Sequence, residues 1–165
     1  MTAFDDVLAA NASFADRYVD EGLAGRAARG LAVVTCMDSR IEPLTLLGLA
    51  HGDAKILRTA GARVTDDVVR SLVLANVLLG VERVLVMAHT DCGMAKTDDA
   101  GVHAAALAQS GLDLRSMDFH TIADQAATLR SDVQRLRSSP FLPADLAVIG
   151  CVYDVSTGRL DVTVP

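Results

Sequence analysis

Short apolar runs rich in β-branched residues recur along this 165-residue chain and predict strands. The three clearest are "LAVVT" at 31–35, "AKILRT" from residue 54 and "ERVLVMAH" at 82–89. The third is apolar almost throughout, which is typical of a strand buried on both faces of a parallel sheet. Near the end, "LAVIGCVYDVSTGRLDVTV" holds two further runs, and the turn residues "STGR" between them predict a hairpin.

Stretches with apolar residues at helical spacing lie before and between these runs. The first spans residues 2–22 and predicts an amphipathic N-terminal helix. Thr65 followed by two aspartates favours a helix over 66–79, because its hydroxyl can cap the first N–H groups and the acids lie at the positive end of the helix dipole. Further helices are expected from Pro43 in "PLTLLGLAH", near 100–109, and over "TIADQAATLRSDVQRLRSS".

The alternation of strands and helices predicts an α/β fold with a mostly parallel central β-sheet flanked by helices, because such crossovers are right-handed and bring successive strands into one sheet. An N-terminal helix precedes this sheet, and the C-terminal hairpin lies at its edge. The chain is 51% hydrophobic and has no visible repeat or linker, so we expect a single domain over residues 1–165.

Charge and composition exclude several classes of partner. Fifteen basic against twenty-one acidic side chains give a net charge of −6, so no basic surface for nucleic acid is expected. The most apolar run, "VVRSLVLANVLLGVERVLVMA", is interrupted by charged residues and is not expected to enter a membrane. The N-terminal acids do not fit a secretory or transit signal, which predicts a cytoplasmic location. Three cysteines then indicate reduced thiols with a metal or catalytic use.

Polar side chains follow two of the predicted strands where each strand ends. "CMDSR" places Cys36, Asp38 and Arg40 after the first strand, and "HTDCGM" places His89 and Cys92 after the third. Because parallel strands direct their carboxyl ends to the same edge of a sheet, these two groups can meet there. Two thiolates and one imidazole with a fourth position open suit Zn²⁺ better than Mg²⁺, Ca²⁺ or Mn²⁺, which prefer oxygen.

Asp38 is close enough in sequence to be a fourth metal ligand, or to accept a hydrogen bond from a zinc-bound hydroxide. Arg40 can hold the same carboxylate in a bidentate pair and so compete with the metal for it, which predicts a switch between open and closed coordination. Three other residues are given more ordinary roles. Asp91 is interpreted as a turn residue, and His103 and His120 as surface residues or proton relays, between which the sequence does not choose.

These motifs resemble those of the β-class carbonic anhydrases, in particular the small bacterial type. The likeness rests on C-x-D-x-R in "CMDSR", on H-x-x-C in "HTDCGM", and on "ILRTAGARVTDDVVRSL" between them, where Thr59 stands in place of the usual asparagine. The resemblance implies reversible hydration of carbon dioxide to bicarbonate and a proton by a zinc-bound hydroxide.

The resemblance also assigns roles to individual residues. It implies one Zn²⁺ per subunit, an aspartate–arginine pair that gates the metal, and a glycine that lines the substrate pocket. The implied zinc ligands are Cys36, His89 and Cys92. The implied gating dyad is Asp38 with Arg40, and the glycine near the substrate is Gly61. Neighbouring subunits are expected to pack on the apolar helix 66–79, with the first helix reaching across its partner in a homodimer or larger homo-oligomer.

Other functions fit parts of the same pattern. A zinc-stabilised interaction module without catalysis would result if Asp38 closed the site permanently. A hydrolase of another small heterocumulene, carbonyl sulfide or carbon disulfide, could use the same scaffold. A thiol enzyme based on Cys36 is disfavoured, because a phosphatase loop needs an arginine where Glu42 stands and no C-x-x-C is present.

Overall fold

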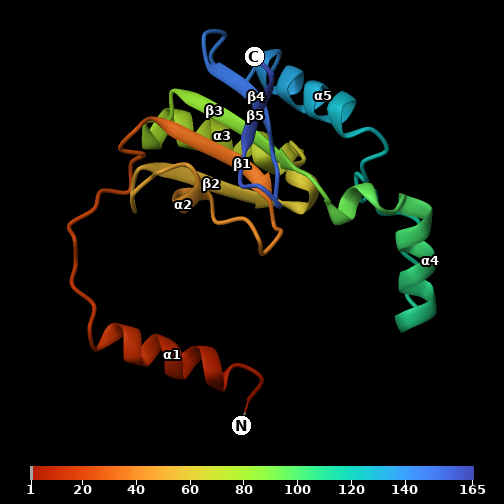
Figure 1. Cartoon of the computed structure of the whole chain (residues 1–165), viewed down its shortest axis with the longest axis horizontal. Coiled ribbons are helices and arrows are strands. Elements are labelled where there is room, and N and C mark those ends of the chain that lie inside the picture. The colour runs from red at the N-terminus through yellow and green to blue at the C-terminus, as the bar shows by residue number, and fades with distance from the viewer. Residues whose placement is uncertain (1) are drawn as a thin grey trace.

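A five-stranded sheet forms the centre of the protein in the computed structural model, which describes residues 2–165. The strand order is β2-β1-β3-β4-β5 (Figure 1). The first four strands are parallel and β5 pairs antiparallel with β4, so the predicted mostly parallel sheet with its C-terminal edge hairpin is confirmed. The strands are β1 Leu31–Cys36, β2 Ala54–Thr59, β3 Arg83–His89, β4 Ala147–Tyr153 and β5 Leu160–Val164.

The helices are α1 Asp5–Ala15, α2 Pro43–Leu46, α3 Asp66–Leu79, α4 Asp99–Ser110 and α5 Gln125–Arg137, with short 3₁₀ helices at Ala60–Ala62 and Gly93–Ala95. Helices α3 and α5 pack on the sheet, so the predicted α/β arrangement is confirmed, whereas α1 and α4 extend away from it (Figure 1). The helix predicted over 66–79 coincides with α3 and ends at Gly80, whose φ of 73° makes it a left-handed cap. Thr65 precedes α3 as expected, but its side chain makes no capping hydrogen bond.

The two faces of the sheet bury different sets of side chains. On one face, Val34 and Val86 pack with Leu72 of α3 and Val133 of α5. The other face forms a smaller cluster that includes Val33, Met87, Cys151 and Ile41. Successive residues of β1 point to opposite faces and are buried on both, which explains why this strand and β3 are apolar in sequence.

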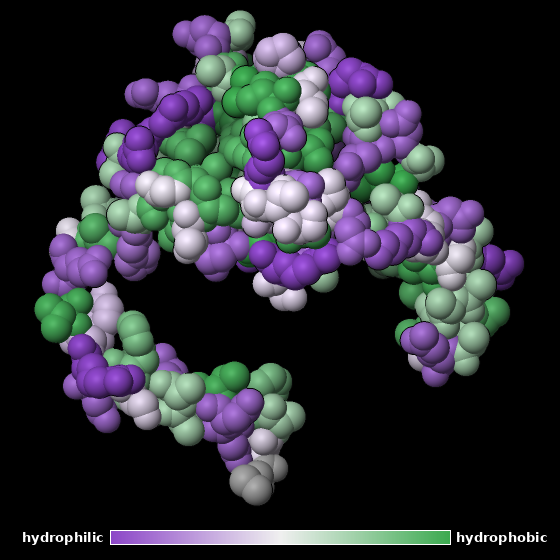
Figure 2. All heavy atoms as spheres, viewed as in Figure 1, coloured by the Kyte–Doolittle hydropathy of each residue, from purple (hydrophilic) through white to green (hydrophobic). Residues whose placement is uncertain are grey.

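Helix α1 stands apart from the sheet at the end of an extended segment (Figure 1). It is shorter than the predicted helix over 2–22, and none of its residues is buried. A helix without packing on its apolar face has little to stabilise its last turns, so residues 16–22 do not continue it. Apolar side chains of this arm are exposed on its surface (Figure 2): Phe4, Val7, Leu8, Phe14, Tyr18, Val19 and Leu23.

Helix α4 projects from the other side of the body (Figure 1). It coincides with the helix expected near 100–109, and the chain returns from it toward the sheet through an irregular segment that ends at α5. Among the described residues, no helix combines the length and the apolar character needed to cross a membrane.

Candidate metal centre

The ends of β1 and β3 bring three possible metal ligands together. Cys36 is the last residue of β1, His89 is the last residue of β3, and Cys92 lies in the loop that follows. The two strands are parallel neighbours, so both ends point to the same edge of the sheet. One ligand atom from each of the three residues lies within 4.8 Å of the other two, and all three residues are buried. This group could hold a metal ion.

The imidazole of His89 is oriented for a metal. Its Nδ1 lies 2.8 Å from the carbonyl oxygen of Thr90, an acceptor, so Nδ1 carries the proton and Nε2 offers a lone pair. This Nε2 is buried and has no hydrogen-bond partner within residues 2–165. A buried polar atom left without a partner is costly, and a metal ion held with the two thiols would satisfy it.

The two thiols have environments that suit metal binding. The backbone N–H of Gly61 donates to Sγ of Cys36 at 3.3 Å. Burial, together with the adjacent Cys36, raises the pKa of the Cys92 thiol above its ordinary value. Two neighbouring thiols therefore resist joint ionisation when no cation is present, and a divalent cation bound between them favours both thiolates.

Gly61 occupies a position that a larger residue would not fit. Its φ is +69°, and a Cβ there would lie 2.8 Å from Cδ1 of Ile122 and 3.2 Å from Cβ of Met94. The absence of a side chain allows the backbone N–H to approach Cys36 directly. Gly61 therefore lies at the candidate metal centre, with its N–H in contact with the sulfur of Cys36.

Asp38 and Arg40 form a bidentate ion pair beside these three residues. Nε of Arg40 donates to Oδ1 of Asp38 at 3.0 Å, and Nη2 donates to Oδ2 at 2.7 Å. Oδ2 also lies 3.9 Å from Nε2 of His89. The hydrogen bonds from Arg40 hold the pKa of the Asp38 carboxyl well below its usual range, so this carboxylate is ionised at neutral pH.

Two polar side chains that the sequence did not single out support this arrangement. Nε of Arg58 donates to the carbonyl oxygen of Cys36 at 3.0 Å, and Nη2 of Arg58 donates to that of Asp38 at 2.6 Å. Nε2 of Gln125, at the start of α5, donates to the carbonyl oxygen of His89 at 2.7 Å. Both residues act over separations of 20 or more positions. Arg58 lies within the segment on which the family resemblance partly rests, whereas Gln125 lies in no motif.

The sequence model of the carbonic anhydrase family matches residues 31–160. Over its full length the chain is also 33% identical to the whole of β-carbonic anhydrase 1 from Mycobacterium tuberculosis, across 165 residues. The chain belongs to the β-carbonic anhydrase family. Its fold is similar to the crystal structure of a carbonic anhydrase from Streptococcus mutans, with a TM-score of 0.92, 39% identity, and coverage of 99% of this chain and 98% of the other.

Some relatives of this chain are named for a different substrate, carbon disulfide. The chain is 30% identical to the carbon disulfide hydrolase of Acidithiobacillus thiooxidans over 154 residues, which cover 80% of this chain and 76% of that protein. The β-carbonic anhydrases that match over the whole chain support carbonic anhydrase activity here.

His103, His120 and Cys151 do not belong to the candidate metal centre of this carbonic anhydrase. His103 Nε2 contacts the carbonyl oxygen of Met117, and His120 lies beside Asp118. Cys151 is buried in β4, within the core of the second face. Asp91, interpreted from sequence as a turn residue, does adopt a positive φ of 57°, but its carboxylate also binds Arg40. The sequence did indicate that Asp91 lies near the candidate ligands, because it stands between His89 and Cys92.

Proposed function

We propose that this protein is a zinc enzyme that catalyses the reversible hydration of carbon dioxide to bicarbonate and a proton, with one Zn²⁺ per subunit held by Cys36, His89 and Cys92. The observation that carries the proposal is the buried, unpartnered Nε2 of His89 beside two buried thiols. Two sulfur donors and one nitrogen suit zinc, and three protein ligands leave a position for water. When bound, zinc would lower the pKa of that water and so supply a nucleophile near neutral pH.

The surrounding residues orient the ligands for this role. The Thr90 carbonyl fixes the tautomer of His89, and Gln125 holds the main chain of the same residue. The N–H of Gly61 stabilises negative charge on Cys36. In the proposed site, Gly61 also borders the place where carbon dioxide binds, because its N–H already contacts a ligand sulfur and it has no side chain to fill the space.

Asp38 and Arg40 form the proposed gating dyad. Asp38 is ionised and lies within 3.9 Å of Nε2 of His89, so it can accept a hydrogen bond from the attacking water and keep its lone pair directed at the substrate. Arg40 retains this carboxylate through two parallel hydrogen bonds and thereby keeps it from becoming a fourth ligand.

Metal analysis combined with stopped-flow hydration of carbon dioxide tests the proposal. We expect about one zinc per chain and hydration activity in the native protein, and loss of both in Cys92→Ala. Cys151→Ala is the matched control, because Cys151 is also a buried cysteine but lies in β4. Native protein that contains zinc and hydrates no carbon dioxide at any pH would favour the non-catalytic module instead. Metal-free native protein would contradict the proposal altogether.

Carbon disulfide is the second candidate substrate, because relatives 30% and 32% identical to this chain are carbon disulfide hydrolases. Each alignment with those relatives covers 80% of this chain, whereas the β-carbonic anhydrase of M. tuberculosis matches over all of it. Carbon dioxide is therefore preferred. Release of sulfide from carbon disulfide by the same zinc-loaded protein, at a higher kcat/KM than hydration of carbon dioxide, would reverse this preference.

A homodimer or larger homo-oligomer is also proposed. The apolar side chains of the α1 arm are exposed, and so are Leu74, Val77 and Leu78 on α3. A hollow of about 900 Å³ separates the arm from α2 and β2 (Figure 2). Exposed apolar surface on this scale fits a second copy, with α1 reaching across it. Light scattering should give at least twice the mass of one chain, and Val77→Glu should lower the measured mass.

Two further expectations from the sequence, a cytoplasmic location and a single domain over residues 1–165, stay predictions. Fractionation of cells that express the protein tests the first. A single cooperative unfolding transition of the purified protein tests the second.

A further inference from the structure

We propose that Asp91 is a positioning residue for the Asp38–Arg40 pair. Its carboxylate holds the guanidinium of Arg40 in the orientation in which Arg40 binds Asp38. This inference deepens the proposed function and rests on it, because it adds to the gating dyad a third member that the family motif C-x-D-x-R does not contain.

The guanidinium of Arg40 uses different nitrogen atoms for the two carboxylates. Nε and Nη2 face Asp38, whereas Nη1 donates to Oδ2 of Asp91 at 2.8 Å. Nη2 also donates to the carbonyl oxygen of Asp91 at 3.2 Å. The two carboxylates therefore do not compete for one donor. Asp91 instead fixes the far side of a planar group whose near side holds Asp38.

Arg40 needs such a fixed point. Its side chain is 45% exposed, and a long side chain in water loses rotamer freedom whenever it is held in one geometry. With Asp91 in place, part of that entropy is lost before Asp38 binds, so the pair with Asp38 forms more readily. Without it, Arg40 would spend more time in water, and Asp38 would be free to turn toward the metal ligands.

Lys96 holds Asp91 in turn. Nζ of Lys96 lies 2.5 Å from Oδ1 of Asp91, so each oxygen of this carboxylate has its own cation. The row Asp38, Arg40, Asp91, Lys96 alternates in charge. Because Lys96 balances the charge of Asp91, the positive charge of Arg40 stays available to Asp38.

The contact also joins the two loops that carry the ligands. Arg40 follows Cys36 on the loop after β1, and Asp91 lies between His89 and Cys92 on the loop after β3. The two residues are 51 positions apart in sequence. Asp91 therefore fixes the dyad relative to all three ligand atoms and not only to its own loop.

Asp91 could serve the turn through its backbone or position Arg40 through its carboxylate, and a glycine at this position separates these two roles. Its φ of 57° is one that glycine adopts without strain and that aspartate and asparagine tolerate. If the residue served only the turn, Asp91→Gly would be harmless. If its carboxylate positions Arg40, Asp91→Gly removes the contact with Arg40 while the turn is retained. Asp91→Asn leaves a weaker, uncharged hydrogen-bond acceptor for Arg40.

Two measurements on the full chain test the proposal. In zinc-loaded protein, we expect Asp91→Gly to lower kcat about tenfold with KM unchanged, and Asp91→Asn to lower it less, in the range found for groups that orient a metal site. In ¹⁵N NMR spectra, the Nε–H of Arg40 should exchange with water faster in Asp91→Gly than in the native protein. Asp113→Asn, which alters an exposed aspartate outside the metal centre, should change neither.

The exchange measurement needs no turnover, so it tests the contact even if carbon dioxide is not the substrate. An unchanged exchange rate in both Asp91 variants would overturn the inference. Faster exchange with kcat retained would also overturn it, because the contact would then have no part in the reaction. If Asp91→Gly fails to fold, the same two readouts in Asp91→Asn decide.

Discussion

The chain contains two aspartate–arginine pairs with the same spacing, and only one of them lies beside the candidate metal ligands. In Asp38–Arg40 and in Asp113–Arg115, the arginine donates from its backbone N–H, from Nε and from Nη2 to the aspartate two residues earlier. The Nε to Oδ1 distances are 3.0 and 2.9 Å. The pair itself is therefore a local consequence of the tripeptide Asp-x-Arg.

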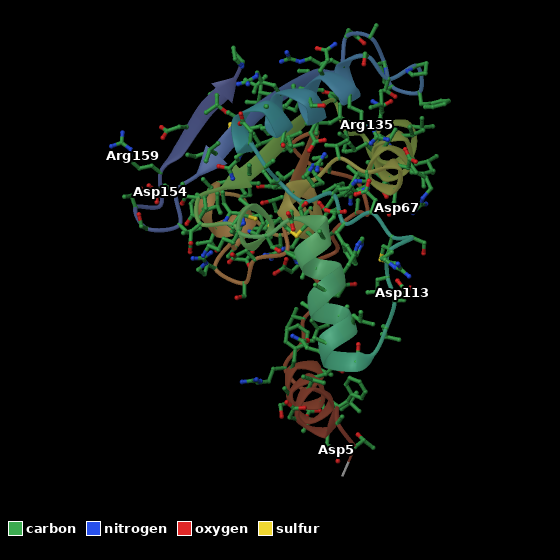
Figure 3. The ribbon with its side chains drawn as sticks, turned by 90° about the vertical axis from the view of Figure 1, so that its right-hand side faces the viewer. Asp5, Asp67, Asp113, Arg135, Asp154 and Arg159 are labelled. Carbon is green, nitrogen blue, oxygen red and sulfur yellow. The ribbon has the colours of Figure 1, made fainter. Side chains whose placement is uncertain are left out.

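The two pairs differ in what surrounds them. The side chain of Asp38 is 17% exposed and lies beside His89, whereas that of Asp113 is 54% exposed. Asp113 follows α4, on the segment that returns from this projecting helix (Figure 3). Within the described part of the chain, the guanidinium of Arg115 makes no hydrogen bond except to Asp113, but Arg40 also binds Asp91. The fold, and not the Asp-x-Arg motif, therefore determines which pair lies beside His89.

Removing the arginine from each pair should produce the largest difference. We expect Arg40→Ala to lower kcat for carbon dioxide hydration by about 100-fold, because the freed Asp38 can take the fourth position on the metal. Arg115→Ala should leave kcat unchanged. Stopped-flow kinetics measure both, and a crystal structure of zinc-loaded Arg40→Ala locates the carboxylate of Asp38. An active variant with Asp38 still directed away from the metal would refute the gating role of Arg40.

The next largest effect is expected at Gly61, whose backbone N–H donates to the sulfur of Cys36. Gly61→Ala places a methyl group 2.8 Å from Ile122 at a φ of +69°, which should destabilise the fold by about 2 kcal/mol and displace the N–H that Cys36 accepts. We expect zinc affinity to fall about tenfold, measured by competition with a chelator.

The control for this change is an alanine at another left-handed glycine. Gly111→Ala introduces a similar backbone strain next to the second pair, with no atom within 4 Å of the new Cβ. It should lower stability less and leave zinc affinity unchanged. Equal zinc affinities in the two variants would show that the Gly61 N–H does not support the metal site.

A smaller effect is expected from Arg58, which connects the first pair to the metal ligands through the main chain. Arg58→Met retains the packing of the aliphatic part and removes the hydrogen bonds to the carbonyl oxygens of Cys36 and Asp38. Water can then hydrogen-bond to each carbonyl oxygen, so the loss is small. We expect kcat to fall about threefold, which corresponds to an activation free energy raised by roughly 0.7 kcal/mol. Unchanged kinetics would limit Arg58 to a structural role.

The sequence was informative where a signal is local or where topology is simple. Thr65 and Gly80 delimit α3, although Thr65 makes no capping hydrogen bond, and the β-branched runs locate the strands, because chain reversal and burial act over a few residues. The meeting of Cys36 with His89 also follows from the sequence, since parallel strands end at one edge of a sheet. Their role as zinc ligands stays a prediction.

What the sequence did not reveal depends on contacts between distant residues. Asp91 was interpreted as a turn residue because its backbone conformation is local, whereas its bond to Arg40 spans 51 positions. Arg58 lies in a segment that carries the family resemblance, but its hydrogen bonds to the main chain of Cys36 and Asp38 were not predicted, and Gln125 lies in no motif. The predicted length of α1 was wrong for a different reason: helical periodicity continues past Ala15, but residues 16–22 are all exposed, so burial does not stabilise further helical turns.

The smallest predicted effect concerns the second pair and its response to pH. The hydrogen bonds from Arg115 lower the pKa of Asp113 in the folded state below its value of about 3.9 in an unfolded chain. Any stability that the pair contributes is therefore present above pH 4 and is lost as the pH falls through the lower, folded pKa.

The pair is exposed, so solvent screens it, and Asp113→Asn should change the melting temperature at pH 7 by less than about 2 °C. That difference should shrink at pH 3, where the unfolded chain already binds a proton at Asp113, and should be reduced by salt. Thermal melts of both proteins at the two pH values measure it. A difference that grew on acidification would mean that Asp113 stabilises the fold through something other than its charge, and the contrast with Asp38 would then have to be drawn from packing instead of from electrostatics.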